Sequence, residues 1–190
     1  MRHNFKQHIQ SLGELCANAE AHNHAGTMIG VDDALAWTID AVAEVYRRGA
    51  KVMFVGNGGS AAIASHMAID FTRNGGVTAM AFNDAAALTC FGNDFGYEQV
   101  FARQVTLQAR SGDLLVAISS SGASPNIIRA VEAARDADCL VLTLSGFAPD
   151  NPLRSCGDMN LYVPSQHYGR VEVAHLVLCH ALLDLSGGWA

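Results

Sequence analysis

The sequence lacks long hydrophobic runs, since all its apolar stretches are far shorter than the roughly 20 residues that span a bilayer. Its N-terminal residues contain no apolar signal core either. It has no run of Lys or Arg, and its formal net charge is −6, which argues against a nucleic-acid surface. Its five cysteines show no CxxC spacing and lie mostly in apolar segments. We therefore expect a cytoplasmic protein with reduced cysteines, no membrane contact and no nucleic-acid partner.

The composition is that of an ordinary globular domain, because half of the 190 residues are apolar and 16% are charged. This length suits one domain with one sizeable core. We therefore predict a single domain over residues 1–190, in which a helical pair at 1–48 precedes an α/β core at 50–186.

The first 50 residues have the periodicity of two amphipathic helices. Apolar residues such as Phe5, Ile9 and Leu12 recur at helical spacing and predict a helix over about 3–24. A second helix follows, with Asp32 or Asp33 as its N-cap, and ends at Gly49. We expect these helices to pack either on the sheet or on another subunit.

From Lys51 onward, apolar strands alternate with helices. The predicted strands are 51–55, 77–82, 113–118, 139–144 and 159–163, and the predicted helices are 59–72, 84–92, 96–109, 124–137 and 168–186. Strands that are apolar throughout are typical of a sheet covered on both faces. The series therefore predicts a three-layer α/β sandwich around a five-stranded parallel sheet, with ligands at the carboxyl ends of the strands.

Two short Gly/Ser loops each follow a predicted strand and open a helix. The first is Gly56-Asn57-Gly58-Gly59-Ser60, and the second runs from Ser119 to Ser124. Such loops present free backbone N–H groups and hydroxyls to one point, which makes an anion site. Two of them indicate a phosphorylated small molecule held by neutral donors.

The first loop has another interpretation. Gly56-x-Gly58-x-x-Ala61 also satisfies the dinucleotide-binding pattern, and Asp84 lies roughly where a ribose-binding acid is wanted. That hypothesis leaves the serine loop without a role, and the chain is short for a dehydrogenase with a substrate domain. Tight turns needed only for packing are a third interpretation of either loop alone.

Ionisable residues recur on two of the predicted helices. His66 and Asp70 are four residues apart on one, and Glu172, His175 and His180 interrupt the apolar last helix. His66, Asp70, Glu172 and one of these histidines would suit Zn²⁺. However, eight residues of helix separate Glu172 from His180 by about 12 Å. Either Glu172 pairs with His175, or one of the two distant residues comes from a neighbouring subunit. The alternative to a metal site is that His66 and Asp70 form a surface pair and that the histidines of the last helix are core residues.

Together these motifs resemble those of the sugar isomerase (SIS) domain family, and within it the phosphoheptose isomerases. The resemblance covers about residues 50–185 and rests on motifs in the same order: Gly56 to Ser60, His66-x-x-x-Asp70, Asn93-Asp94-Phe95-Gly96-Tyr97, Ser119 to Ser124 with Asn126-Ile127-Ile128, and Glu172 with His180. It implies a flavodoxin-like fold, a homotetramer with active sites at subunit contacts, Zn²⁺ in some members, and aldose–ketose isomerisation of a seven-carbon sugar phosphate for heptose biosynthesis.

The resemblance also assigns roles to residues. It implies that Asp70 and His180 are catalytic and that His66, Asp70, Glu172 and His180 are candidate metal ligands. Substrate binding falls to Asn57, Gly58, Gly59, Ser60, Asp94, Ser119, Ser120, Ser121, Ser124 and Glu172.

The chain departs from the family pattern at several of these positions. Asp70 stands where the family has Glu, Glu172 where it has Gln, and Gly169 where it has Asp. In the segment after His66 and Asp70, a family Arg aligns near Asn74 rather than Arg73. An isomerase of a different sugar phosphate therefore stays open, as do a non-catalytic tetrameric SIS protein of the replication-initiation type and a sugar-phosphate-sensing regulator.

Overall fold

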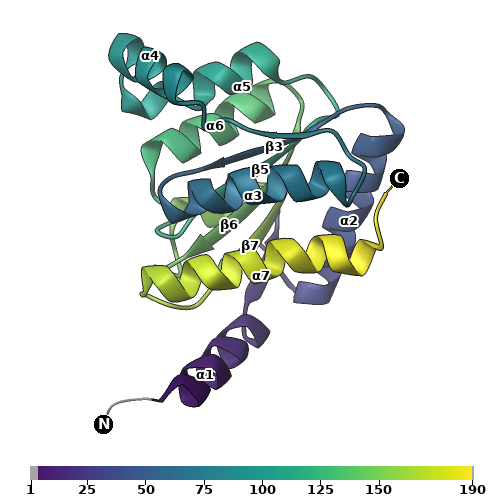
Figure 1. Cartoon of the computed structure of the whole chain (residues 1–190), viewed down its shortest axis with the longest axis vertical. Coiled ribbons are helices and arrows are strands. Elements are labelled where there is room, and N and C mark those ends of the chain that lie inside the picture. The colour runs from purple at the N-terminus through teal and green to yellow at the C-terminus, as the bar shows by residue number, and fades with distance from the viewer. Residues whose placement is uncertain (1–3, 190) are drawn as a thin grey trace.

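Within the described residues, the sheet at the centre of the molecule has seven strands in the order β2-β1-β7-β6-β5-β3-β4. Its inner strands, from β3 to β7, can be followed in Figure 1. The structure, a computed structural model, describes residues 4–189. The strands are β1 (Glu20–Asn23), β2 (Met28–Ile29), β3 (Val52–Gly56), β4 (Ala79–Ala81), β5 (Leu114–Ser119), β6 (Leu140–Gly146) and β7 (Met159–Val163). The α-helices are α1 (Phe5–Ala17), α2 (Val31–Arg47), α3 (Gly59–Arg73), α4 (Ala85–Phe95), α5 (Ala102–Gln108), α6 (Pro125–Asp136) and α7 (Tyr168–Ser186), with short 3-10 helices at Tyr97–Gln99 and Pro152–Ser155.

The predicted α/β fold is confirmed, and all five predicted strands form and pair in parallel from β4 to β7. The sheet extends beyond them because β1 pairs antiparallel with the free edge of β7, and β2 pairs antiparallel with β1. A parallel sheet with an antiparallel edge is common, since an exposed edge strand offers unpaired N–H and C=O groups.

The prediction of one helix over 3–24 is wrong beyond Ala17. The helix ends there, with Asn18 as its C-cap, and the following residues form β1. The segment expected to be only a break is a hairpin turn, in which the Gly26 N–H donates to the Asn23 carbonyl at 2.9 Å. The prediction failed here because helical periodicity is a local signal and carries no information about the hydrogen bonds between β7 and β1. The predicted helix at 96–109 is likewise divided, because the chain forms a 3-10 turn before α5.

Alternating side chains of the strands pack into two separate cores, one on each face of the sheet. Phe54 and Val116 face the layer of α2, α3 and α7, while Met53 and Leu115 face the layer of α5 and α6. Figure 1 shows these helices in front of and behind the strands. Each fully buried large apolar side chain contributes roughly 1.5–3 kcal/mol of transfer free energy. None of the helices within residues 4–189 combines the length and hydrophobicity needed to cross a bilayer.

Register places both Gly/Ser loops at one edge of the sheet. β3 ends at Gly56, which pairs with Ile118 on the neighbouring β5, and β5 ends one residue later at Ser119. Because the strands are parallel, their carboxyl ends meet on the same side, where a ligand can contact both loops.

One histidine is enclosed between α7 and the sheet. His175 is 0% exposed, its Nε2 lies 3.0 Å from the Ser145 carbonyl oxygen, and its Nδ1 has no partner among the described residues. Nε2 therefore donates to the carbonyl, and a second proton on Nδ1 would be a buried donor without an acceptor. Burial lowers the pKa of His175 to about 4, and the Ser145 hydrogen bond opposes this shift. This histidine is neutral in the folded protein near neutral pH.

This depressed pKa predicts a loss of stability in mild acid. The unfolded chain binds a proton at position 175 below about pH 6.5, whereas the folded chain binds it only near pH 4, so the free energy of unfolding should fall by up to about 1.4 kcal/mol per pH unit between these values. Urea unfolding at a series of pH values measures this. His175→Gln should flatten the profile and His8→Gln, at an exposed site, should not. Parallel profiles for all three proteins would contradict the assignment.

Candidate active site

The first Gly/Ser loop turns the chain sharply from β3 into α3. Gly58 has φ +54°, a left-handed conformation that favours glycine, and the Asn57 carbonyl accepts from the Ser60 N–H at 2.9 Å. Gly56 has no room for a side chain, because a Cβ there would lie 2.5 Å from the Ser60 carbonyl oxygen. The loop thus leads directly into the N-terminus of α3, where helical N–H groups favour anions.

The second loop concentrates hydroxyl groups. Ser119 and Ser120 are each 5% exposed, and the Ser119 hydroxyl lies 3.3 Å from that of Ser124. Ser124 is the N-cap of α6, yet its side chain makes no capping hydrogen bond. The Ser120 hydroxyl is buried with no partner among the described residues. A buried hydroxyl without a partner is costly, so this loop is suited to a ligand that accepts hydrogen bonds.

The two loops line one pocket of about 220 Å³. Its lining includes every loop residue that was predicted to bind substrate and one predicted residue of α7: Asn57, Gly58, Gly59, Ser60, Ser119, Ser120, Ser121, Ser124 and Glu172. Ile118 and Tyr168 complete it. The sequence motifs did not single out Tyr168, which reaches the pocket because α7 begins there.

A pair of amides joins the two loops. The Asn57 side-chain amide donates to Asn126 Oδ1 at 2.9 Å, and the Asn126 amide donates back to Asn57 Oδ1 at 2.8 Å. The Tyr97 hydroxyl also donates to Asn57 Oδ1, at 3.1 Å. Asn126 is 3% exposed, and it lies just past the Ser124-Pro125 start of α6. This reciprocal pair, which sequence reasoning did not predict, sets the distance between the two sources of donors.

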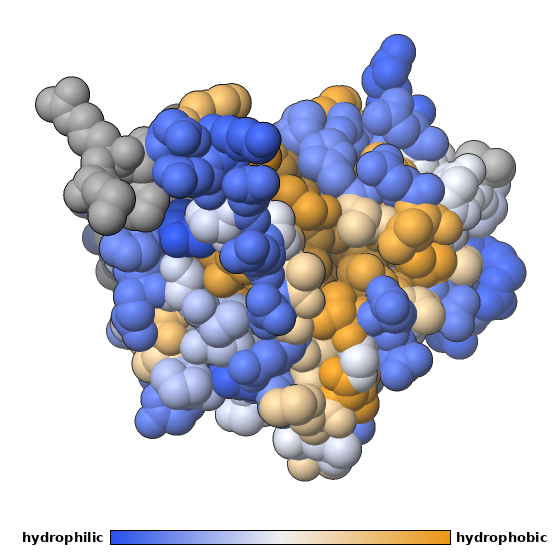
Figure 2. Space-filling view, turned by 90° about the horizontal axis from the view of Figure 1, so that it is seen from below, coloured by the Kyte–Doolittle hydropathy of each residue, from blue (hydrophilic) through white to orange (hydrophobic). Residues whose placement is uncertain are grey.

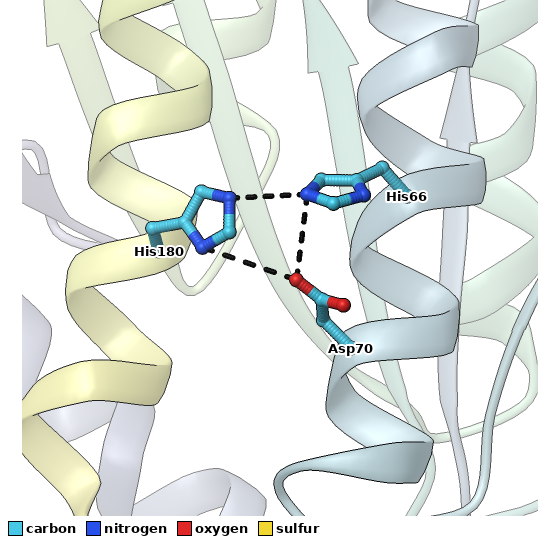
Figure 3. Close-up of side chains that lie close together, drawn as sticks. All are labelled: His66, Asp70 and His180. Atoms are coloured by element: carbon cyan, nitrogen blue, oxygen red, sulfur yellow. Dashed lines mark hydrogen bonds and ion pairs between the residues drawn. The ribbon is translucent and has the colours of Figure 1, made fainter.

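Further along α3 and α7, three ionisable side chains meet between the helices (Figure 3). His66 Nε2 lies 3.1 Å from His180 Nε2 and 3.4 Å from Asp70 Oδ2, and His180 Nδ1 lies 4.0 Å from the same carboxylate oxygen. Asp70 is the least exposed of the three, with 19% of its side chain accessible. The predicted proximity of position 70 to position 180 is therefore present within one subunit.

These three residues fit a metal ion by their chemistry. One atom of each of His66, Asp70 and His180 lies within 4.8 Å of the other two. Two imidazole nitrogens and one carboxylate oxygen form a donor set that Zn²⁺ accepts while keeping a position open for substrate.

Two predicted site residues do not join the group of His66, Asp70 and His180. Glu172 lines the pocket instead of joining His66, Asp70 and His180, because two turns of α7 separate it from His180. The four-residue metal set is therefore not assembled within one subunit. Asp94 lies on exposed α4, where it accepts a hydrogen bond from Asn93 at 2.9 Å, and it does not line the pocket.

The pocket and the three-residue group occupy one pair of helices. Gly59 of α3 contacts Glu172 of α7, and further along His66 and Asp70 contact His180, so the two helices run side by side in the same direction (Figure 1). At 1.5 Å per residue, His66 lies about 9 Å beyond Ser60 along the helix axis. Asp70 lies about 15 Å beyond Ser60 by the same measure, and its carboxylate comes within 3.4 Å of His66 Nε2. An anion at the pocket and a reacting group near His66 can thus belong to opposite ends of one small molecule.

Comparison with known proteins agrees with this architecture. Residues 27–146 match the model of the SIS domain family. The chain is 36% identical over 183 residues to the phosphoheptose isomerase of Helicobacter hepaticus, covering 93% of this chain and 92% of that protein. It is 40% identical over 148 residues to that of Aliarcobacter butzleri, covering 75% and 78%. The solved phosphoheptose isomerase of Neisseria gonorrhoeae superimposes with a TM-score of 0.80 at 33% identity, over 95% of this chain and 94% of that one.

The reciprocal amide pair yields a testable prediction about stability. Asn126→Ala should lower the free energy of unfolding by about 1–3 kcal/mol, because the half-buried Asn57 amide loses its reciprocal partner. Asn57→Ala should have a similar effect, while the double variant should cost clearly less than the two single changes added together, since the pair is lost only once. Urea unfolding of the four proteins measures this coupling, and strictly additive effects would contradict the pairing.

Proposed function

The chain belongs to the SIS domain family, and on this premise we propose that it is an aldose–ketose isomerase acting on sedoheptulose 7-phosphate. The observation that carries the proposal is the arrangement along α3 and α7. A pocket of hydrogen-bond donors lies at the start of the two helices, and a carboxylate with two imidazoles lies further along them. This geometry suits a sugar phosphate that is held at one end and reacts at the other.

The serine loops are proposed to hold the phosphate. Its oxygens only accept hydrogen bonds. The unpaired Ser120 hydroxyl can donate to them, and so can the Ser124 hydroxyl, which accepts from Ser119 but makes no capping hydrogen bond. The N-terminus of α3 adds a favourable dipole. The binding energy of the phosphate holds the reacting carbons in position. Contacts with a part of the substrate that does not react thus contribute to catalysis.

Asp70 and His180 are proposed to move the protons. Isomerisation of a ketose to an aldose removes a proton from C1, forms an enediol and returns a proton to C2, while another proton passes between the oxygens of these carbons. The carboxylate of Asp70 is the base at carbon, and His180 serves the oxygens as acid and base. The shared contact of both imidazoles with Asp70 Oδ2 keeps these groups on one side of the substrate.

Zn²⁺ is a proposed cofactor, and His66, Asp70 and His180 are the residues that would hold it. When bound, such an ion would polarise the substrate carbonyl and stabilise the charge that develops on its oxygen.

The proximity of Asp70 to His180 also favours an enzyme over a non-catalytic SIS protein, which needs no carboxylate at position 70.

A homo-oligomer, with a tetramer as the proposed state, is supported by exposed apolar surface. The face in Figure 2 carries a band of hydrophobic side chains. Phe5 and Ile9 of α1 are 79% and 48% exposed, and Val173 and Val177 of α7 are also exposed. Exposed apolar surface of this kind marks interaction sites. A neighbouring copy could then supply Asp94, which lies away from the pocket of its own subunit.

A cytoplasmic location is part of the same proposal, and the five free cysteines are consistent with it.

The reaction is tested by incubating the protein with ketose phosphates in deuterated water. Sedoheptulose 7-phosphate should give an aldose phosphate with deuterium at C2, since the enediol is reprotonated from groups that exchange with solvent. Asp70→Asn should bind inorganic phosphate as the native protein does and lose at least about a hundredfold in turnover. A chelator arm separates metal-dependent from metal-independent activity. Full turnover by Asp70→Asn would remove this residue from the mechanism.

The oligomer is tested on α1, away from both parts of the site. Sedimentation velocity should show a species several times larger than the 20.1 kDa chain. Replacing Phe5 and Ile9 together by Ser should shift it toward smaller species, because their apolar side chains would be buried between subunits. A native protein that sediments as a monomer at micromolar concentration would refute the oligomer while leaving the isomerase proposal to the previous experiment.

A further inference from the structure

We propose that Glu172 determines the specificity of the anion pocket, by weakening its hold on a bare anion and accepting a hydrogen bond from a hydroxyl next to the phosphate. This inference rests on the proposed phosphate-binding function of the pocket and deepens it. It assigns opposite roles to two parts of one pocket: the serine loops donate, and Glu172 accepts.

The carboxylate lies inside the pocket because residue 59 is glycine. A Cβ at Gly59 would lie 2.6 Å from Glu172 Oε1, so the carboxylate occupies the space that a side chain there would need. Gly59 is the first residue of α3 and does not have a positive φ, so its backbone conformation does not require glycine. Close approach of Glu172 to the start of α3 is therefore what the glycine permits.

Among the described residues that line the pocket, Glu172 alone is charged; the others are Asn, Gly, Ser, Ile and Tyr residues. Within residues 4–189 it has no Lys, Arg or His partner closer than 4.0 Å. The partial positive charge at the N-terminus of α3 offsets its charge only in part. An anion that enters the pocket thus meets a carboxylate that is not paired with a cation among the described residues.

A carboxylate distinguishes between the phosphate and the hydroxyl groups of a ligand. It accepts hydrogen bonds and cannot donate them, so it repels phosphate oxygens and attracts a hydroxyl. One charge about 6 Å from a dianion across a water-filled pocket changes its affinity by about tenfold. The pocket should therefore bind a phosphate ester of a polyol in preference to free phosphate or sulfate, because only the ester brings a donor for Glu172.

Calorimetric titration of sulfate into the full chain tests the charge, since sulfate stays a dianion over the working pH range. The titrations are run on protein as purified and after chelator treatment, so that a bound metal cannot account for the result. Glu172→Gln keeps the shape of the side chain and removes its charge, and it should bind sulfate about tenfold more tightly. The gain should shrink when salt is raised from about 0.05 M to about 1 M, because salt screens the repulsion.

A matched control separates this effect from net charge. Glu132→Gln also removes one negative charge, on an exposed side chain of α6, and should leave sulfate affinity unchanged. An increase in affinity cannot arise from misfolding, so the expected result is not open to a purely structural explanation. With sedoheptulose 7-phosphate as ligand, Glu172→Gln should gain less affinity than with sulfate, because the acceptor for the hydroxyl is weakened.

Ser124→Ala distinguishes failure of this inference from failure of the proposed function. If Ser124→Ala weakens sulfate binding while Glu172→Gln leaves it unchanged or weaker, the pocket binds anions and the role of Glu172 is refuted. An equal gain for sulfate and the sugar phosphate would refute the acceptor role. If neither substitution alters sulfate binding, the phosphate pocket itself is refuted, and this inference falls with it.

Discussion

The parallel pairing of β3 with β5 is the constraint on which the site depends. It places Gly56 opposite Ile118, so the two Gly/Ser loops leave the sheet side by side, and the Asn57–Asn126 amide pair then fixes the distance between them. A slip by one residue would turn every side chain of the strand to the other face and expose apolar residues that now lie in two cores. The same hydrophobic burial that stabilises the sheet therefore positions the donors.

The second constraint is the parallel course of α3 and α7. Both helices start at the pocket, so each residue further along them lies further from the pocket. This arrangement gives the molecule two chemically different regions about two helical turns apart: a pocket rich in neutral hydrogen-bond donors, and a group of one carboxylate and two imidazoles. Glu172 lies in the pocket, yet it is a carboxylate like Asp70 in the other region. Its charge therefore distinguishes it from the neutral residues around it.

Much of the fold could be predicted from the chain, because its signals are local. Apolar runs bounded by Gly and Ser identified the five parallel strands, and Ser124-Pro125 identified the start of α6. The errors arose where distant partners override local pattern. Residues 20–23 continue a helical periodicity but form β1, because β7 presents an unpaired edge to them. No local feature of either segment reveals that pairing.

The sequence by itself determined which chemical groups exist and which of them share an element. Two donor-rich loops follow strands, His66 and Asp70 share one face of a helix, and Glu172 and His180 share another helix two turns apart. Tertiary structure alone decided that His180 meets Asp70 while Glu172 meets Gly59. The physical reason is that helix periodicity relates residues within α3 or within α7, whereas the direction and offset of one helix against the other follow from how both pack on the sheet.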